Sequence, residues 1–322
     1  MPAPFVAHTD KQWFDHLSRK AIPSDGVYPA HLDEVNFWSP NAATAPKKFA
    51  PGEPLFFRLG APDRCIAGYA FYAATVHVPV DLAWEAFGEK NGAPTFSQFA
   101  RMVSREGPGP FPNLTCNLLR GAVFWPESQW IKWGEARGYP ATGVQRGRGE
   151  TDPDNARILL AALTRTPLPR PADLVPAFAP LTVDERQFTP GTHVQREGQG
   201  TFRLRLLEAY GGACAVTGEH TEPVLEAAHI QRYLGPASNH VQNGLLLTAE
   251  FHTLFDRHLV TIETAGPNDA YRLRVSPQLR RRWDNGHRYY AFDNKPLRLP
   301  ADVNLRPSIE ALQQHNRNFL AA

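Results

Sequence analysis

The spacing of apolar residues in the first 145 positions predicts a fold built from short strands. Apolar and aromatic runs alternate with glycine, proline and charged positions, which is typical of strands in a small barrel or sandwich. Two runs have the spacing of short helices instead. We expect strands at residues 33–38, 54–59, 65–72, 76–80, 114–125 and 129–133, and helices at residues 10–17 and 82–87.

The middle of the chain has the composition of a connection between two domains. Residues 138–148 are dominated by glycine and arginine, and residues 166–190 are rich in proline, which favours extended chain. Between them, residues 154–165 place apolar side chains on one helical face. We therefore expect a first domain at 1–145, a helix and linker at 146–194, and a second domain at 195–322.

After a predicted helix at 203–210, the second domain shows the pattern of two strands followed by a helix. An apolar run ends at His229, a polar loop leads to Asn243, and a second apolar run follows directly. Thr248 is a favourable N-cap residue, so we expect a helix at 249–256. A ββα unit of this kind can gather polar side chains from the strand end, the loop and the helix.

Four side chains of this unit have the chemistry that phosphodiester hydrolysis needs. His252 and Asp256 are four residues apart, so they share one face of the predicted helix. Together they can bind a divalent cation, which neutralises charge on the scissile phosphate. His229 can accept the proton of the attacking water, because imidazole titrates near neutral pH. The amide of Asn243 can hold the loop or orient a histidine.

The order of the segments LEAAHI, NGLLL and FHTLFD resembles the motif of HNH endonucleases, and the resemblance covers residues 203–290. It implies a ββα-metal nuclease domain that uses Mg²⁺, Mn²⁺ or another divalent ion. It also implies that His229 is the general base, that Asn243 is the central asparagine of the motif, and that His252 is a metal ligand.

The sequence departs from the HNH family at two positions. Ala228 stands where many relatives have a metal-binding aspartate or histidine, so Asp256 is the candidate for the missing ligand. Cys214 keeps one cysteine of a zinc-binding CxxC pair that some relatives carry, so we expect no structural zinc. Ala228 also leaves open a protein that binds nucleic acid and has lost nuclease activity.

The N-terminal segments VNFWSP, PGEPLFFRL and IAGYAFY resemble the start of a PUA-like domain of the EVE kind. The segment LAWEAFGEKNG at 82–92 resembles the N-terminal half of bacterial HNH proteins, and these resemblances cover residues 5–135. Relatives in the PUA-like superfamily recognise modified bases by flipping them into an aromatic pocket. Such a pocket needs a stacking surface and polar groups for the base edge. The candidates are Trp13, Asn36, Phe37, Trp38 and Ser39. The alternative for these aromatic rings is a place in the core, the commoner fate of Trp and Phe.

The charge of the chain gives little information about its binding partner. A net charge of +2 permits a nucleic-acid partner without requiring one. The run Arg280, Arg281 and Arg282 is either a solvated face or a contact with the DNA backbone. His220, His240 and His258 are expected to face solvent.

Cysteine usage and the N-terminus indicate the compartment. The three cysteines, Cys65, Cys116 and Cys214, form no CxxC pair, which favours a reducing environment. The sequence shows no signal-peptide pattern and no apolar run long enough to cross a membrane, so we expect a cytoplasmic protein without membrane contact.

These observations lead to an α+β protein with an N-terminal PUA-like small β-barrel domain and a C-terminal ββα-metal (HNH) nuclease domain. The expected function is metal-dependent restriction of double-stranded DNA that carries a modified base, such as a modified cytosine. One ββα site cuts one strand, so cutting both strands requires a homodimer or two visits. The alternatives are a nuclease that recognises sequence or structure, an inactive nucleic-acid-binding protein, and a protein directed to RNA.

Overall fold

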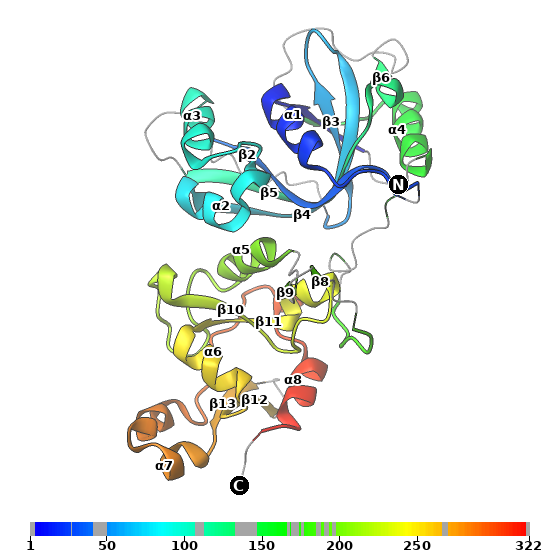
Figure 1. Cartoon of the computed structure of the whole chain (residues 1–322). Helices are drawn as coiled ribbons and strands as arrows, with labels where there is room; N and C mark the ends of the chain where they lie inside the picture. The colour runs from blue at the N-terminus through cyan, green and yellow to red at the C-terminus, as the bar shows by residue number, and fades with distance from the viewer. Residues whose placement is uncertain are drawn as a thin grey trace. The chain divides into compact units, whose positions relative to one another are not determined.

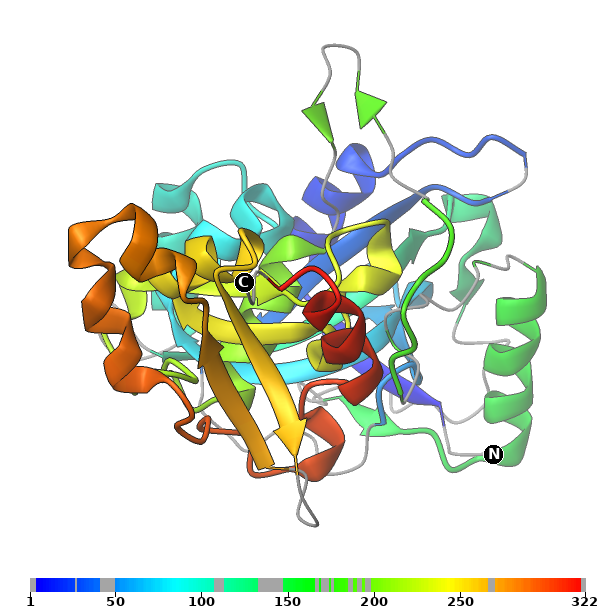
Figure 2. The same ribbon diagram turned by 90° about the horizontal axis from the view of Figure 1, so that it is seen from below.

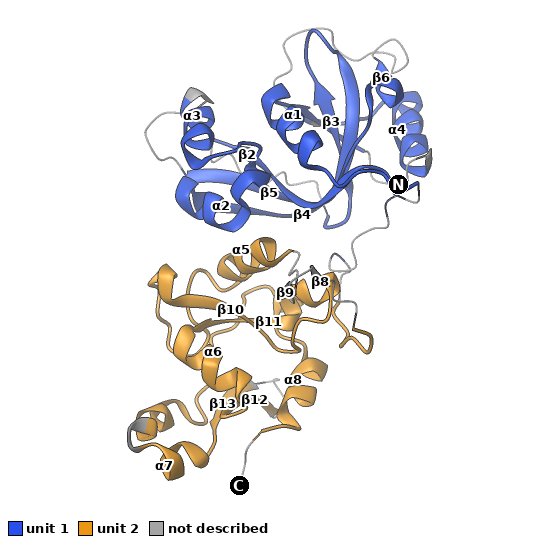
Figure 3. Cartoon of the chain, in the orientation of Figure 1, with its two compact units in different colours: residues 1–174 blue, residues 175–322 orange. Residues whose placement is uncertain are grey.

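In a computed structural model, the structure describes residues 4–26, 28–40, 50–106, 113–132, 147–165, 168, 174, 177–184, 188–189, 193–194, 198–265 and 270–319. The chain divides into two compact units, residues 1–174 and residues 175–322 (Figure 3). Helix α4, in the segment predicted to join the domains, is grouped with the first unit. Residues 138–146 of the glycine- and arginine-rich segment, and parts of the predicted linker, including residues 169–173 and 190–192, lie outside the described residues.

Unit 1 combines a mixed sheet with short helices (Figure 1). Its strands are β1 (Phe5–Thr9), β2 (His31–Ser39), β3 (Pro54–Leu59), β4 (Cys65–Pro79), β5 (Asn113–Phe124), β6 (Ile131–Lys132) and β7 (Arg148–Gly149). Its helices are α1 (Lys11–Lys20), α2 (Val80–Phe87), α3 (Phe96–Glu106) and α4 (Pro153–Arg165).

The sheet of unit 1 is organised around the long strand β4. The strand order is β2-β5-β4-β3-β1-β7, and β6 also pairs with β4. β1 runs parallel to β3, while the other described pairings are antiparallel. The register of β4 against β5 shifts at two places, and such bulges twist and bend a strand. The bulges let one strand cover the two stretches that the sequence predicts as separate strands.

Helix α1 supplies a large part of the core of unit 1. Asp10 caps the helix by accepting a hydrogen bond from the backbone N–H of Trp13, and the buried residues recur at helical spacing. Trp13, Phe14 and Leu17 belong to one buried cluster with side chains of β3, β4 and β5. Gly92 permits this packing, because a Cβ there would lie 2.1 Å from the ring of Trp13.

Unit 2 is a set of small hairpins and helices (Figure 1). Its strands are β8 (Phe188–Thr189), β9 (His193–Val194), β10 (Leu225–His229), β11 (Gly244–Thr248), β12 (Val260–Ala265) and β13 (Ala270–Val275). Its helices are α5 (Gln199–Ala209), α6 (Ala249–Asp256), α7 (Gln278–Arg282) and α8 (Ile309–Asn316). β10 pairs with β11, and β12 pairs with β13, both antiparallel.

Helix α8 lies beside the β12–β13 hairpin (Figure 2). The two elements are joined by hydrogen bonds, including one of 2.9 Å from Asn316 Nδ2 to the carbonyl of Ile262. The predicted order of strand, strand and helix at 223–256 is confirmed by β10, β11 and α6, and the predicted helix bounds 249–256 agree with α6. The β12–β13 hairpin and α8 were not predicted from the sequence.

Candidate active site

The β10–β11 hairpin brings the motif residues together. His229, the last residue of β10, pairs with Gly244, the first residue of β11. Helix α6 begins directly after β11, so its side chains lie close to the strand end. Thr248 is the N-cap residue of α6, as predicted, but its side chain makes no capping hydrogen bond.

Helix α5 packs closely over this hairpin. A Cβ at position 244 would lie 2.7 Å from side-chain atoms of both Phe202 and Leu206, so only glycine fits there without a shift. The close approach places the buried ring of Phe202 on the imidazole of His229, with centroids 4.2 Å apart and planes at 20°. The stacking fixes the plane of the His229 ring.

A hydrogen bond fixes the rotation of His229 in that plane. The imidazole Nε2 lies 3.1 Å from Oδ1 of the buried Asn239. Because an amide oxygen only accepts, Nε2 carries the proton, and Nδ1 is the atom that can accept one. An imidazole held in this tautomer has the form that a general base requires.

Asn243 holds the loop that follows β10. Its side-chain amide donates to the carbonyls of Gln231 and Ser238, both at 2.9 Å, and its Oδ1 accepts from the N–H of Gln231 at 2.8 Å. The Asn243 side chain is fully buried, and its hydrogen bond to Ser238 is buried as well. Its role in the structure is therefore to position the segment next to His229.

His252 lies between two carboxylates. Its Nδ1 is 2.6 Å from Oε2 of Glu226, and its Nε2 is 3.5 Å from Oδ2 of Asp256. A carboxylate accepts the Nδ1 proton, which leaves the Nε2 lone pair directed toward the side of Asp256. The sequence reasoning predicted the pairing of His252 with Asp256 but missed Glu226.

Ala228 faces the interior. Its side chain is fully buried, whereas its neighbours Ala227 and His229 line the pocket beside the hairpin. The carboxylates close to His252 come from Glu226, two positions earlier on the strand, and from Asp256 on the helix. The carboxylates beside His252 therefore belong to Glu226 and Asp256, and position 228, where many HNH relatives have a metal ligand, supplies none.

His229, His252 and Asp256 share one pocket of about 590 Å³ in unit 2, whereas the buried Asn243 is not among its described lining residues. Residues that line it include His229, Arg232, Tyr233, His252, Asp256 and His258. The exposed guanidinium of Arg232 is a cation next to the catalytic candidates that the sequence reasoning also missed.

Of the three histidines expected to face solvent, only His220 is exposed. His240 is buried, its ring stacks on Phe178, and its Nδ1 accepts from the backbone N–H of Gln242. His258 is half-buried and lines the pocket. The expectation was wrong for these two because both rings pack against other rings of the fold.

The pocket ends at His315 of α8, whose imidazole is structural. Its ring stacks on Phe255 at 3.8 Å, and its Nε2 lies 3.0 Å from the carbonyl of Phe255. Burial lowers the pKa of His315 to about 4, against a smaller raising effect of its hydrogen bond to that carbonyl. His315 is therefore neutral at pH 7.

The pocket offers few protein ligands for the divalent ion that the HNH resemblance implies. Among the described residues, no group of three or more His, Cys, Asp or Glu side chains stands ready to hold a metal. His252 and Asp256 nevertheless offer one nitrogen and one carboxylate next to an open pocket, and Mg²⁺ commonly binds to few protein ligands and several waters. The donor set fits a partly hydrated divalent ion.

Cys214 is a buried free thiol whose Sγ accepts from the N–H of Thr217.

The five predicted base-binding residues lie in or next to the core of unit 1. Trp13 is buried, contacts Phe37 edge to face, and donates from Nε1 to the carbonyl of Asn36. The Asn36 side chain is fully buried and bonded to Asn91 and Cys116. Phe37, Trp38 and Ser39 are half-buried. The packing of Trp13 and Asn36 argues against contact with a base, and the base-binding set stays a prediction.

The predicted DNA-backbone residues Arg280, Arg281 and Arg282 are exposed on α7. The guanidinium of Arg280 lies over the ring of Tyr290, 4.2 Å from its centroid. These arginines are not among the described residues that line the pocket of His229. Their contact with DNA stays a prediction.

Comparisons with known proteins agree with the site. Residues 214–263 match a family model described as HNH endonuclease. The comparison with curated proteins gives no match. No described helix is long and apolar enough to cross a membrane.

Among solved structures, the chain is similar to ASCH from Zymomonas mobilis, with 14% identity and a TM-score of 0.34, over 49% of this chain and 94% of that one. It is also similar to a structure titled modification dependent TagI restriction endonuclease, with 12% identity and a TM-score of 0.26, over 92% of this chain and 79% of that one. The C-terminal unit contains an HNH endonuclease domain. The strands and helices of both units give the α+β class that the sequence predicts, and the match over residues 214–263 agrees with the predicted HNH domain. The PUA-like small β-barrel of the N-terminal unit stays a prediction.

Proposed function

We propose that this chain is a metal-dependent endonuclease that cuts double-stranded DNA, and that unit 1 directs it to DNA with a modified base. The observation that carries the nuclease part is the shared pocket of His229, His252 and Asp256, three residues that lie within the match to the HNH endonuclease model. The three side chains combine a fixed proton acceptor with a nitrogen and a carboxylate that suit a divalent ion.

In the proposed reaction, His229 Nδ1 takes a proton from a water molecule while the water oxygen forms a bond to phosphorus. The bond from phosphorus to the 3′ oxygen breaks, and that oxygen leaves as a hydroxyl after taking a proton from water. The products are a 3′-hydroxyl and a 5′-phosphate. Phe202 and Asn239 contribute by keeping the imidazole in the orientation and tautomer that this step needs.

His252 and Asp256 would hold the divalent ion. When bound, the ion stabilises the charge that develops on the phosphate and on the leaving oxygen. Glu226 fixes the His252 ring by accepting its Nδ1 proton, which keeps Nε2 available as a ligand. Arg232 adds a cation at the same pocket, where a DNA phosphate would lie.

Support for a base-recognising role of unit 1 comes from a second pocket, about 710 Å³ in volume. Its lining includes aromatic rings, of which Phe14, Phe124 and Trp125 are buried while Tyr28 is exposed and Trp130 is half-buried. Side chains of Ser18, Ser24 and Gln129 add polar groups. A flipped base needs such a combination of stacking surface and hydrogen-bonding groups. This aromatic pocket is a better candidate than the predicted set around Trp13.

The test is cleavage of plasmid DNA with Mg²⁺ or Mn²⁺. Substrates would be unmodified DNA and DNA with 5-methylcytosine, 5-hydroxymethylcytosine or N6-methyladenine. His229→Ala is the inactive variant, and His220→Ala, an exposed histidine outside the pocket, is its matched control.

We expect cutting of one modified substrate, lost in His229→Ala and kept in His220→Ala. Equal cutting of every DNA substrate would support the proposed nuclease activity and would contradict the proposed recognition of a modified base. Cutting of RNA in preference to DNA would replace the proposed substrate. Absence of cutting with every metal, together with tight DNA binding, would favour the inactive binding protein that Ala228 suggests.

A further inference from the structure

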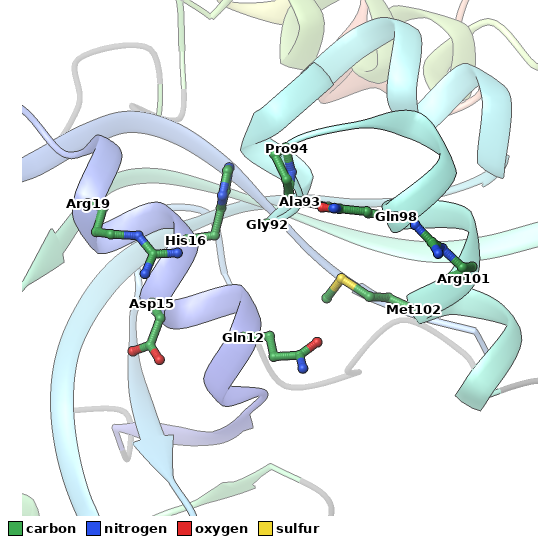
Figure 4. Close-up of a pocket in the computed structure, with 10 residues that line it drawn as sticks. All are labelled: Gln12, Asp15, His16, Arg19, Gly92, Ala93, Pro94, Gln98, Arg101 and Met102. Atoms are coloured by element: carbon green, nitrogen blue, oxygen red, sulfur yellow. The ribbon is translucent and has the colours of Figure 1, made fainter.

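A second groove in unit 1 lies between helices α1 and α3 (Figure 4). Its volume is about 460 Å³. Helix α1 contributes Gln12, His16 and Arg19, and α3 contributes Gln98 and Arg101. Figure 4 shows these two sets of side chains facing each other across the segment that begins at Gly92. We call this feature the arginine groove.

The acidic groups at the arginine groove are neutralised by lysines. Lys11 Nζ lies 2.6 Å from Oδ1 of Asp15, and Lys20 Nζ lies 2.8 Å from Oε2 of Glu89. Both pairs involve exposed lysines, so each carboxylate has its charge matched without using an arginine.

The two arginines have no such match. Across the part of the chain that the structure describes, no carboxylate forms an ion pair with Arg19 or Arg101. Arg101 uses its Nε to donate to the carbonyl of Ser97 at 3.1 Å, which leaves the two terminal nitrogens of its guanidinium for a ligand. Two exposed guanidinium groups on opposite sides of one groove form a site for an anion.

The floor of the arginine groove carries an incompletely bonded polar group. His16 is only 8% exposed, and its Nε2 makes no hydrogen bond, although Glu89 Oε2 lies 3.5 Å away. Burial lowers the pKa of His16, partly offset by the nearby Glu89. A buried polar atom without a hydrogen bond is uncommon in folded proteins and is satisfied when a ligand or water reaches it.

The chemistry of the lining favours a phosphate over a base. Among the described lining residues, His16 has the only aromatic ring, and it is buried in the floor. A base would need a stacking surface, which the aromatic pocket offers and this groove does not. Asp15 lines both features, so the arginine groove and the aromatic pocket adjoin across α1.

We propose that the arginine groove binds the sugar–phosphate backbone of DNA, with Arg19 and Arg101 donating to phosphate oxygens. The assignment rests on the proposed function, because that function makes DNA the anionic partner. The DNA strand would pass along α1, with phosphates in the arginine groove and a recognised base in the adjoining aromatic pocket. Gln12 and Gln98 would donate to the same backbone from the groove walls.

The test measures DNA binding by the full chain, in a His229→Ala background that prevents cutting. Fluorescence anisotropy of a labelled DNA duplex gives Kd between about 50 and 200 mM salt. The test variant is Arg19→Gln with Arg101→Gln, and the charge-preserving variant is Arg19→Lys with Arg101→Lys. The matched control is Arg64→Gln with Arg157→Gln, which removes two exposed arginines outside the groove. Circular dichroism checks that each variant is folded.

Removing both groove arginines should weaken binding about 10- to 100-fold near 100 mM salt and reduce the slope of log Kd against log salt by about 2. The lysine variant should keep most of that slope, and the control should bind like the parent. An unchanged slope in the glutamine variant would overturn the groove assignment and leave the nuclease intact. If the parent chain itself fails to bind DNA, the proposed function and the groove assignment both fall.

Discussion

The HNH hairpin of unit 2 and the aromatic segment of unit 1 differ in what the structure makes of their predicted site residues. In unit 2, His229 of β10 and His252 and Asp256 of α6 line one pocket. In unit 1, Trp13 and Asn36 are buried, and Trp13 Nε1 and Asn36 Nδ2 donate hydrogen bonds inside the unit. The prediction in unit 2 came from polar residues in the order of a known motif, whereas the prediction in unit 1 came from aromatic residues. This difference in evidence explains why only the residues of unit 2 share a pocket.

Several polar residues in the order and spacing of a known motif are informative together, because each buried polar group must also be satisfied by hydrogen bonds. His229 follows a run that otherwise packs into the hairpin, and Asn243 is buried only because three hydrogen bonds satisfy it. An aromatic residue is different, because the area that could stack on a base is equally suited to a core. Trp13 shows the second outcome, with Gly92 leaving room for its ring.

The largest expected effect is on the free energy of unfolding of unit 1, and it distinguishes an aromatic residue of the core from one that lines the pocket. Trp13→Ala should lower the free energy of unfolding by about 3–5 kcal/mol, because it empties the centre of a buried cluster. Tyr28→Ala, at an exposed ring of the aromatic pocket, should change it by less than about 0.5 kcal/mol while weakening binding of modified DNA. Urea unfolding and DNA titration measure the two effects. A stable Trp13→Ala chain that has lost only base recognition would return Trp13 to the binding site.

The next effect concerns how His252 is held. Glu226→Gln removes the charge that accepts the Nδ1 proton of His252, so we expect the affinity for Mn²⁺ to fall about 10-fold or more. Isothermal titration calorimetry measures this affinity without DNA. Glu250→Gln is the matched control. Glu250 lies on α6, the helix of His252, but its carboxylate pairs with Arg288 and not with His252. Equal Mn²⁺ affinity in wild type and Glu226→Gln would show that Glu226 does not position the ligand.

The smallest effect is a pH dependence of stability in unit 2. His315 has a pKa of about 4 in the folded chain, below its ordinary value of 6.5, so between these values the unfolded state binds a proton that the folded state does not. Stability from this group is present above pH 6.5 and is lost as the pH falls toward 4. From pH 7 to pH 5 the loss should be about 2 kcal/mol.

The His315 effect is measured by urea unfolding of wild type and His315→Gln at both pH values. The variant is less stable at pH 7 but should lose less on acidification. A wild-type stability that stays constant between pH 7 and pH 5 would contradict the neutral, buried imidazole described here.

Much of the ββα site was predictable because its residues follow local rules. The strand ending at His229 and the helix from Ala249 were recognisable from apolar periodicity and from the N-cap position of Thr248. The spacing of His252 and Asp256 fixed their common helix face. By contrast, Glu226 reaches His252 across the gap between strand and helix, and such a contact depends on how α6 packs, which the sequence alone does not specify.

In unit 1, the sequence indicated strands but not which side chains remain accessible. Helix α3 was missed, so Arg101 could not be placed opposite Arg19. The two predicted strands at 65–72 and 76–80 form the single strand β4, because bulges absorb the irregular alternation between them. Which aromatic rings line a pocket depends on packing among several strands, and local pattern gives little information about it.

The central claim is that unit 2 hydrolyses DNA with His229 as the general base. Its most direct test is single-turnover cleavage of a supercoiled plasmid, with and without Mg²⁺ or Mn²⁺, by wild type, His229→Ala and His220→Ala. The account predicts cutting only with the metal, a rate about 10²- to 10⁴-fold lower in folded His229→Ala, and an unchanged rate in His220→Ala. Cutting by His229→Ala at the wild-type rate would contradict it.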